Sequence, residues 1–312
     1  MVYSSTTGII CTEGQLWKDQ RNLVQKWLKD IGMVKYGAKR VALEARIMDG
    51  VERSIKEFND KIQDLNDIKI NPVEILNHNF GNVVNDLVFG VKYDRDDETW
   101  NYLQYLQEEG VKYIGICGAV NFLPILRFLP SNKKVMNFLM TGIVKTHKIY
   151  DNIINNCQNK LDEPQKTSTD QQECILRYFL MERQFRVQQQ DEKLMNCSQK
   201  QLRFLLADIY GASFDTTFTT LRWFLYFVAK NYHVQKRLYQ EMEIFGKDGI
   251  ISLDILENMP YFKATVAEVL RIRSVVPAGI PHGTNKDSKL CGYHIPKNSM
   301  VCFINKINNL NN

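Results

Sequence analysis

The sequence lacks the features that mark several large protein classes. No run approaches the roughly 20 apolar residues that cross a bilayer, and the first residues do not resemble a secretory signal peptide. Any membrane association is therefore expected to come from outside this sequence or from surface patches. The 40 Lys and Arg residues form no runs and are nearly balanced by 35 Asp and Glu, for a net charge of +5. That pattern argues against a nucleic-acid partner.

Cysteine is sparse, and no two cysteines form a C-x-x-C motif. The seven cysteines are odd in number and widely scattered. We therefore expect reduced thiols and a protein that faces the cytosol. Internal repeats and low-complexity tracts are also missing.

Common catalytic and nucleotide-binding motifs are absent as well. The chain has no G-x-G-x-x-G, no G-x-x-x-x-G-K and no H-E-x-x-H. Composition alone does not exclude a Ser/His/Asp hydrolase, but there is no G-x-S-x-G nucleophile elbow. His282, Cys291 and His294 lie close in sequence, yet a zinc site would need a fourth ligand or water and tight spacing.

What is present predicts a helical fold with a real core. The chain has 312 residues, of which 44% are hydrophobic, as in an ordinary globular protein. Residues 198–230 are predicted to form one long central helix, which Ser198 and Gln201 open as a capping box. Apolar residues recur at helical spacing before and after its middle, so we expect it inside a large fold.

The middle of this helix, residues 211–217, is poor in strong helix formers and reads as a polar break. Ala212 and Thr216 are four residues apart and share a face, so a small side chain lies beside a hydroxyl. Asp215 would be costly to bury unless it were paired or hydrated. The alternative is a solvent-filled kink, where Ser and Thr bond back to the preceding carbonyls.

Other elements follow from apolar spacing and from start and stop signals. An apolar stripe that includes Val41, Val51 and Ile55 marks the second helix as structural. Residues 115–130 are apolar and broken by Gly and Pro, which suggests a ligand cover or a membrane-touching patch. Residues 157–170 are expected to be a polar linker, and residues 290–303 a short hairpin. Further helices are expected at 14–28, 39–59, 72–88, 98–109, 134–159, 171–190, 234–245 and 261–273.

Two short spacings place polar side chains together on helices. Trp17 and Arg21 are four apart, and two donors side by side suit an anionic group. The alternative is a Trp on the core side with Arg stacked over it. Glu268 and Arg271 lie one turn apart and can form an ion pair, in a helix that we expect to be buried.

Three motifs follow one another along the chain: W-x-x-x-R, ASFDTT at 212–217 and E-x-x-R. In that order they resemble the motifs of the cytochrome P450 family of haem-thiolate monooxygenases. The resemblance covers nearly the whole chain. GQLWKDQR is similar to the family's C helix, the central helix to its I helix and AEVLRIR to its K helix. It implies a mainly α cytochrome P450 fold with a small β portion at the C-terminal end. We expect one incomplete domain over 1–312, with a helical core at 1–283 and a hairpin and divergent tail at 284–312.

The resemblance also implies roles for individual residues. Haem (heme, iron protoporphyrin IX) would be the cofactor, and its propionates would be held by donors on three residues. Thr216, with Asp215 beside it, would deliver protons during oxygen activation. Glu268 and Arg271 would be structural. The propionate donors are Trp17, Arg21 and His282, and the residues lining the substrate pocket are Ala212 beside the haem, Val276, Ala278, Gly279 and Ile280.

The segments LRWFLYFVA, RIRSVVPAGIPHG and GYHIPK look most like the microsomal insect enzymes of ecdysteroid synthesis, in particular the 25-hydroxylases. This implies a steroid substrate, electrons from NADPH-cytochrome P450 reductase and a place on the cytosolic face of the endoplasmic reticulum membrane. Alternatives are a monooxygenase that detoxifies foreign lipophiles, or a truncated product without catalysis.

The chain departs from the family pattern in two ways. Ser213 stands where the family usually has Gly, which adds a hydroxyl in a narrow groove. The haem loop F-x-x-G-x-R-x-C-x-G is absent, as are the first helices and the N-terminal membrane anchor. Cys291 and Cys302 lack the glycines and arginine of that loop. We therefore expect no axial metal ligand here and no monooxygenation by these 312 residues alone.

Overall fold

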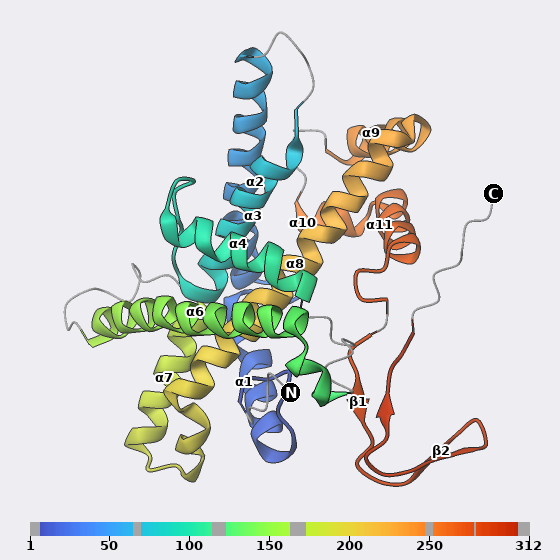
Figure 1. Cartoon of the computed structure of the whole chain (residues 1–312). Coiled ribbons are helices and arrows are strands. Elements are labelled where there is room, and N and C mark those ends of the chain that lie inside the picture. The colour runs from blue at the N-terminus through green and yellow to red at the C-terminus, as the bar shows by residue number, and fades with distance from the viewer. Residues whose placement is uncertain are drawn as a thin grey trace. The chain divides into compact units, whose positions relative to one another are not determined.

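The protein is mainly helical, as the sequence predicts (Figure 1). The computed structural model describes residues 7–64, 70–113, 123–162, 173–246, 252–277 and 279–304. The chain divides into two compact units, Met1–Asp215 and Thr216–Asn312. The long helix α8 (Gln199–Lys230) contains the boundary between them.

The described residues of the first unit are mainly helical. Its elements are α1 (Gly14–Ile31), α2 (Ala38–Asp64), α3 (Pro72–Phe89), α4 (Glu98–Tyr113), the 3-10 helix η1 (Pro124–Phe128), α6 (Pro130–Asp162), α7 (Ile175–Gln188), the 3-10 helix η2 (Glu192–Cys197) and the first part of α8. These bounds confirm the predicted helices.

Helix α3 shows how local sequence fixes its ends. The Asn71 side chain accepts a hydrogen bond from the Val73 N–H at 3.1 Å, and Pro72 occupies the first turn, where its missing N–H costs nothing. At the other end Gly90 has φ 71° and its N–H reaches the carbonyls of Asn85 and Asp86. This left-handed residue ends the helix, as glycine does readily.

The core of the first unit is aromatic and aliphatic. Trp27 of α1 packs edge-on against Phe179 of α7, with ring centroids 6.0 Å apart. Phe89 of α3 contacts both Tyr150 of α6 and Tyr210 of α8. All five side chains are buried, and burial of such rings is the main source of stability in a helical unit of this size.

The α2–α3 interface corrects one prediction. The apolar stripe of α2 does not face the core, because Val41, Val51 and Ile55 are 64%, 40% and 54% exposed. Instead α2 packs on α3 through the side that carries Gly50, where an added Cβ would lie only 2.5 Å from Val83 Cγ2. This close approach sets which side of α2 meets α3.

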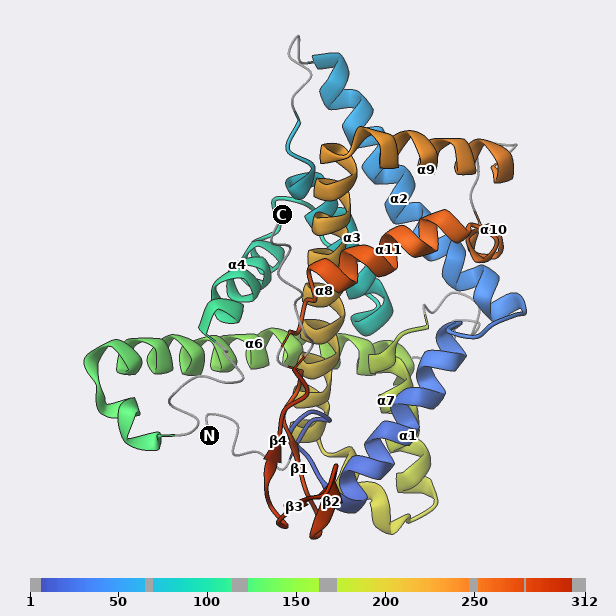
Figure 2. The same ribbon diagram turned by 90° about the vertical axis from the view of Figure 1, so that its right-hand side faces the viewer.

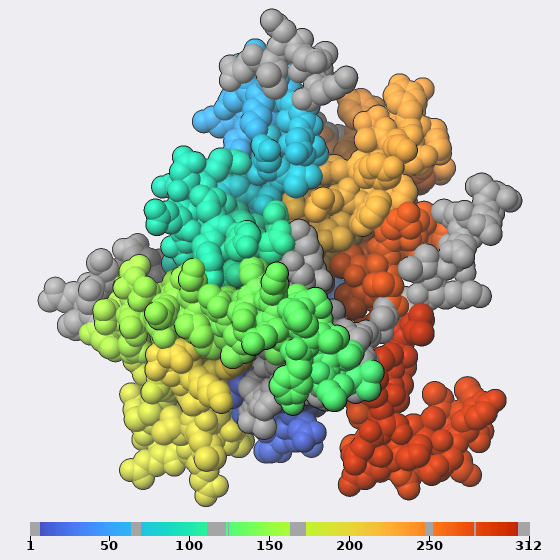
Figure 3. Space-filling model, viewed as in Figure 1, coloured from blue at the N-terminus to red at the C-terminus, as the bar shows by residue number. Residues whose placement is uncertain are grey.

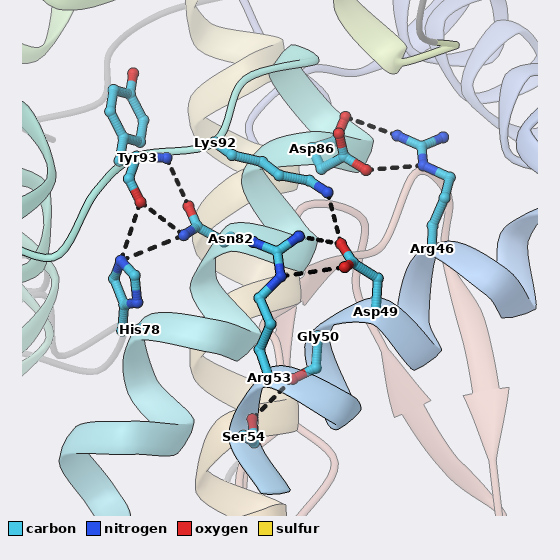
Figure 4. A network of polar contacts seen from close by, with 10 residues as sticks. All are labelled: Arg46, Asp49, Gly50, Arg53, Ser54, His78, Asn82, Asp86, Lys92 and Tyr93. Carbon is cyan, nitrogen blue, oxygen red and sulfur yellow. Dashed lines mark hydrogen bonds and ion pairs between the residues drawn. The ribbon is translucent and has the colours of Figure 1, made fainter. Parts of the chain in front are cut away.

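Polar contacts reinforce that choice of face (Figure 4). Arg46 of α2 donates to the Asp86 carboxylate of α3 at 2.8 Å. Asp49 accepts hydrogen bonds from Arg53 and, at 2.8 Å, from Lys92. Because these charged groups lie on the α3 side of α2, the apolar stripe is turned away.

Half of the predicted cover at residues 115–130, residues 115–122, lies outside the described residues. Its described part contains η1, in which Ile125 and Phe128 are both 73% exposed. This element and the first turns of α6 lie at the surface (Figure 3). The predicted linker at 157–170 is helical up to Asp162, where α6 ends.

In its described residues, the second unit contains the rest of α8, three further helices and four short strands. The helices are α9 (Tyr232–Phe245), α10 (Leu253–Glu257) and α11 (Pro260–Ile272). Helices α9 and α11 lie side by side (Figure 2). The Glu241 carboxylate of α9 accepts the N–H groups of Tyr261 and Phe262, both at 2.8 Å, and so caps the positive end of α11.

Helix α11 is less buried than its apolar spacing predicts. Within it only Val269 is classed as buried, and Leu270 is 43% exposed. The helix packs on α9 and α10, which cover one side of it. The predicted burial of the Glu268–Arg271 pair is therefore wrong.

The strands form two small antiparallel pairs, which differ from the single predicted hairpin. β2 (Ser288–Leu290) pairs with β3 (Tyr293–Ile295), and β1 (His282–Gly283) pairs with β4 (Met300–Val301). The β2–β3 turn consists of Cys291 and Gly292 with φ 47° and 85°, both left-handed as tight hairpin turns require. The predicted partners, 290–296 and 300–303, are instead separated by a turn at Pro296, whose carbonyl accepts the Ser299 N–H at 3.2 Å.

Candidate functional site

Trp17 and Arg21 lie on α1 and share a face, as their spacing predicts. The Arg21 guanidinium carbon lies 5.1 Å from the centroid of the Trp17 ring. Trp17 is half-buried and Arg21 is exposed. In the described parts of the chain, Arg21 makes no ion pair. The cation is therefore held over an aromatic face, and as an exposed side chain it is accessible to a carboxylate.

The centre of α8 differs from the predicted break. Helical hydrogen bonding continues from Gln199 to Lys230 without interruption. Buried Phe214 and Phe218, 3% and 6% exposed, anchor one side of the helix through this stretch and outweigh its weak helix formers. Ser/Thr back-bonding occurs one turn later, where Thr220 Oγ1 donates to the Thr216 carbonyl at 2.8 Å.

Ala212 and Thr216 lie on the other side of this stretch of helix, and Asp215 lies between that side and Phe218. Ala212 is exposed, and Asp215 and Thr216 are half-buried. Ala212 is one turn from both Asp215 and Thr216, which are themselves about 100° apart around the helix. This surface combines a methyl group, a carboxylate and a hydroxyl, which can bind an apolar ligand and move a proton beside it.

Glu268 and Arg271 form the predicted ion pair on α11. Arg271 Nε and Nη2 donate to the two Glu268 oxygens at 2.7 Å and 2.6 Å. The side chains are 53% and 44% exposed. The hydrogen bonds from Arg271 lower the pKa of Glu268, so the carboxylate is ionised near neutral pH.

The segment after α11 contains the predicted pocket residues. The Gly279 N–H donates to the Val276 carbonyl at 3.0 Å and closes a turn. Gly279 has φ 62°, and an added Cβ would lie 2.7 Å from the Phe303 carbonyl oxygen, so only glycine fits there. Ile280 is 49% exposed. Ala278 lies outside the described residues.

His282 lies in β1, opposite Val301 of β4. Its ring contacts Phe303 edge-on, with centroids 5.9 Å apart, and is exposed. Its two ring nitrogens are therefore open to a ligand from solvent.

The structure lends no support to the zinc alternative. Across the described ranges, no group of three or more His, Cys, Asp and Glu residues is placed to hold a metal ion. The six cysteines of those ranges, Cys291 and Cys302 included, are free thiols. That agrees with the prediction of reduced cysteines. Nor does any described helix combine the length and apolar character needed to cross a bilayer.

Each unit carries its own share of the predicted site. The first unit contains Trp17, Arg21, Ala212 and Asp215, and the second contains the others. Trp17 with Arg21, and Glu268 with Arg271, are in direct contact. Ala212 and Thr216, four residues apart on α8, share a helix face.

Sequence reasoning missed two side chains of α8. Gln201 and Asp208 bind the backbone of residues 8–10, which are almost 200 positions away in sequence. The one local signal was Asp208 itself, a carboxylate within an apolar stretch that would need a partner. The expected capping box is only half formed, since the Gln201 N–H bonds Ser198 Oγ at 3.2 Å but the Gln201 amide binds Gly8 instead.

Comparison with known proteins gives a consistent result. The family model described as Cytochrome P450 matches residues 2–306. The chain is 38% identical to Cytochrome P450 306a1 of Drosophila melanogaster, over 94% of this chain and 58% of that protein. It is 30% identical to Cytochrome P450 1A1 of Pleuronectes platessa and 26% identical to Cytochrome P450 18a1 of Drosophila melanogaster, covering 54% of each. The chain thus spans little more than half the length of these relatives.

Proposed function

The chain belongs to the cytochrome P450 family, and from that premise we propose that it is part of a haem-dependent monooxygenase acting on a lipophilic substrate. Proteins of this family bind haem. When bound, haem supplies the activation of dioxygen and the transfer of one oxygen atom to the substrate. The residues of this chain would hold the cofactor, shape the pocket and move protons.

The observation that carries the proposal is the stacked pair on α1. Arg21 lies over Trp17 at 5.1 Å, exposed to solvent and, within the described residues, without an acidic partner. A guanidinium stacked on an indole, whose own N–H is a further donor, is a donor set that matches a carboxylate. Trp17 and Arg21 would therefore bind haem propionates, and the exposed ring of His282 would contribute a further donor.

The α8 surface would supply proton transfer and part of the pocket. Thr216 is proposed as the hydroxyl that holds a proton at Oγ1, with the Asp215 carboxylate beside it as the exchange partner. Ala212 would keep the groove narrow and apolar next to the haem. Glu268 and Arg271 would act structurally through their bidentate ion pair.

For the substrate we propose a neutral steroid, as in ecdysteroid biosynthesis. The support is the likeness of the segments around 221–229, 271–283 and 292–297 to insect enzymes of that pathway. Val276, Ala278, Gly279 and Ile280 would line the pocket, and an apolar lining suits a large uncharged ligand. Detoxification of foreign lipophiles is the competing function, and a catalytically inactive product is the third.

The proposed partners are those that proteins of the same family generally use. We propose that electrons come from NADPH-cytochrome P450 reductase and that the protein works at the cytosolic face of the endoplasmic reticulum membrane. The Cys291 and Cys302 thiols are not proposed as axial ligands of the iron.

Haem binding to Arg21 variants tests the central point. The chain is titrated with haem and the Soret absorbance is followed in wild type and in Arg21→Ala. Loss of the charge-assisted bonds should weaken haem binding roughly tenfold. Arg183→Ala, which removes another exposed arginine from the same unit, should change nothing. Equal affinity in all three proteins would contradict the proposed propionate site.

The substrate is tested separately. A form of the protein completed with a haem-cysteine loop is loaded with haem and supplied with reductase, NADPH and either ecdysteroid precursors or foreign lipophiles, and hydroxylated products are measured. Products from the steroids alone would support the steroid function. Turnover of foreign lipophiles alone would favour detoxification, and no turnover of either would leave the inactive product.

A further inference from the structure

A small cleft lies between α2 and α3, beside the residues that follow α3. Its lining is polar apart from Val83 and the adjoining Gly50. The charged and amide residues of the lining are Arg46, Asp49, Arg53, Asn79, Asn82 and Lys92. Pockets for lipophilic molecules are mostly apolar, so this cleft suits a small charged ligand instead.

Two cations from different elements converge on Asp49 in this cleft (Figure 4). Lys92 Nζ donates to Asp49 Oδ2 at 2.8 Å, Arg53 Nε donates to Oδ1 at 3.1 Å, and Arg53 Nη2 also donates to Oδ2. Hydrogen bonds from Lys92 and Arg53 lower the pKa of Asp49, so its carboxylate is ionised near neutral pH. Within the described residues, neither cation has another acidic partner. One carboxylate is thus shared by two cations.

These two cations keep N–H donors that no protein group uses. An ammonium has three N–H donors and a guanidinium has five. In the described parts of the chain, Lys92 Nζ makes one hydrogen bond and Arg53 Nη1 makes none. The Arg53 and Lys92 side chains are 43% and 35% exposed. The remaining donors are therefore open to a ligand from solvent.

The charge of the cleft favours an anion. Its third cation, Arg46, is held by the Asp86 carboxylate at 2.8 Å. Three cations therefore face two carboxylates, which leaves one positive charge in excess. The excess lies with Arg53 and Lys92, because these two share Asp49.

The geometry matches a phosphate group. Arg53 Nη2 and Lys92 Nζ contact the same oxygen, Asp49 Oδ2, so the two cations lie close enough for one phosphate to reach both. A guanidinium presents a fork of N–H groups to phosphate oxygens, and an ammonium adds a point charge. Asp49 already holds both cations in place, which lowers the entropy that a ligand must lose to order them.

We propose that Arg53 and Lys92 form a phosphate-binding site in the cleft between α2 and α3. The phosphate group belongs to a free phosphate ester or to a phosphoinositide headgroup. The site needs neither haem nor a lipophilic substrate, so it stands apart from the proposed monooxygenase function. If the network only ties Lys92 to α2, the cleft has no saturable affinity for phosphate.

Calorimetric titration of the 312-residue chain with inorganic phosphate tests the site. Ionic strength is held constant with sodium chloride, so that screening does not change during the titration. Lys92→Ala and Arg53→Ala should each weaken phosphate binding roughly tenfold. Lys61→Ala is the matched control. It removes another lysine that links α2 to α3, through Glu74 at 3.7 Å, and should bind phosphate as the wild type does.

Asp49→Asn gives a change of opposite sign, which a loss of folding would not produce. It removes the acceptor that competes with phosphate for Arg53 and Lys92, so phosphate binding should tighten several-fold. Glu74→Gln changes the net charge equally at the Lys61 pair and should leave the affinity unchanged. Absence of saturable phosphate binding in the wild type would overturn the proposal. Equal affinities in the wild type, Lys92→Ala and Asp49→Asn would overturn it as well.

Sedimentation with phosphatidylcholine vesicles, with and without phosphatidylinositol phosphate, distinguishes the two sources of the phosphate group. Sedimentation that requires the phosphoinositide and is lost in Lys92→Ala identifies a lipid headgroup. Binding of inorganic phosphate without sedimentation identifies a free phosphate ester. Sedimentation that persists in both Lys92→Ala and Arg53→Ala, without binding of inorganic phosphate, would contradict the site.

Discussion

Arg186 of α7 donates two hydrogen bonds to Asp19 of α1, from Nη1 to Oδ2 at 2.9 Å and from Nη2 to Oδ1 at 3.0 Å. The two side chains are only 4% and 8% exposed. Asp19 lies between Trp17 and Arg21 in the sequence, so it projects from the opposite side of α1. The buried pair therefore fixes the rotation of α1 and keeps Trp17 and Arg21 turned outward.

Removing one member of this ion pair should lower the free energy of unfolding. Arg186→Met leaves a buried carboxylate without its cation, and we expect the free energy of unfolding to fall by about 3–5 kcal/mol. Urea denaturation followed by circular dichroism measures the change. The double variant Asp19→Leu with Arg186→Met removes both charges and should recover most of the loss. A single-variant loss within error of zero would mean that the pair is open in solution.

The same pair should make stability depend on acid pH. Burial would raise the pKa of Asp19, but hydrogen bonds from Arg186 and Asn196 outweigh it and the pKa lies below its ordinary value. A lowered pKa adds stability above the unfolded value, about 4, and that stability is lost as pH falls through the folded value. Between pH 5 and pH 3, the wild type should therefore lose more stability than Asp19→Asn. Parallel curves for the two proteins would contradict this linkage.

The helices were readable from sequence because their signals are local. Asn71, Pro72 and Gly90 lie within or beside α3 and act on its own backbone. The side of α2 that packs on α3 could not be predicted from the sequence in the same way. An apolar stripe predicts a buried side, but the close fit of Gly50 on Val83 depends on which helix comes next to it in space. The prediction of how the short strands pair was wrong for the same reason, because strand pairing also depends on contacts that are not local in sequence.

In the candidate site, too, the local contacts could be predicted from the sequence and the long-range features could not. Trp17 with Arg21 and Glu268 with Arg271 are spaced by one helical turn, so their contacts could be predicted from the sequence. Their exposure could not, since it depends on neighbouring elements. The contacts of Asp208 could not be predicted from the sequence, because its partners are the backbone N–H groups of Ile9 and Ile10. Backbone partners produce no recognisable pattern of side chains.

One substitution should have opposite effects at two helical glycines. At Gly81 of α3 an added Cβ would lie 2.1 Å from the buried ring of Trp100, whereas at Gly211 of α8 nothing lies within 4 Å. Gly81→Ala should therefore lower the free energy of unfolding by about 1–3 kcal/mol through overpacking. Gly211→Ala should raise it by about 0.5–1 kcal/mol through helix propensity. Urea denaturation measures the free energy of unfolding of both variants. A change of the same sign in both would contradict the close packing of Gly81 on Trp100.

Thr216→Ala should separate proton delivery from the rest of the proposed reaction. Alanine is a better helix former than threonine, so α8 should stay intact while the hydroxyl beside Asp215 is lost. In a form of the enzyme completed with a haem-cysteine loop, loaded with haem and supplied with reductase, we expect dioxygen consumption to continue while the product formed per dioxygen falls several-fold, since proton supply at the right atom typically contributes 10²–10⁴ in rate. The control is Thr217→Ala, which makes the same chemical change about 100° further round the helix, where the side chain is exposed. If both variants keep the wild-type ratio of product to dioxygen, Thr216 has a structural role only.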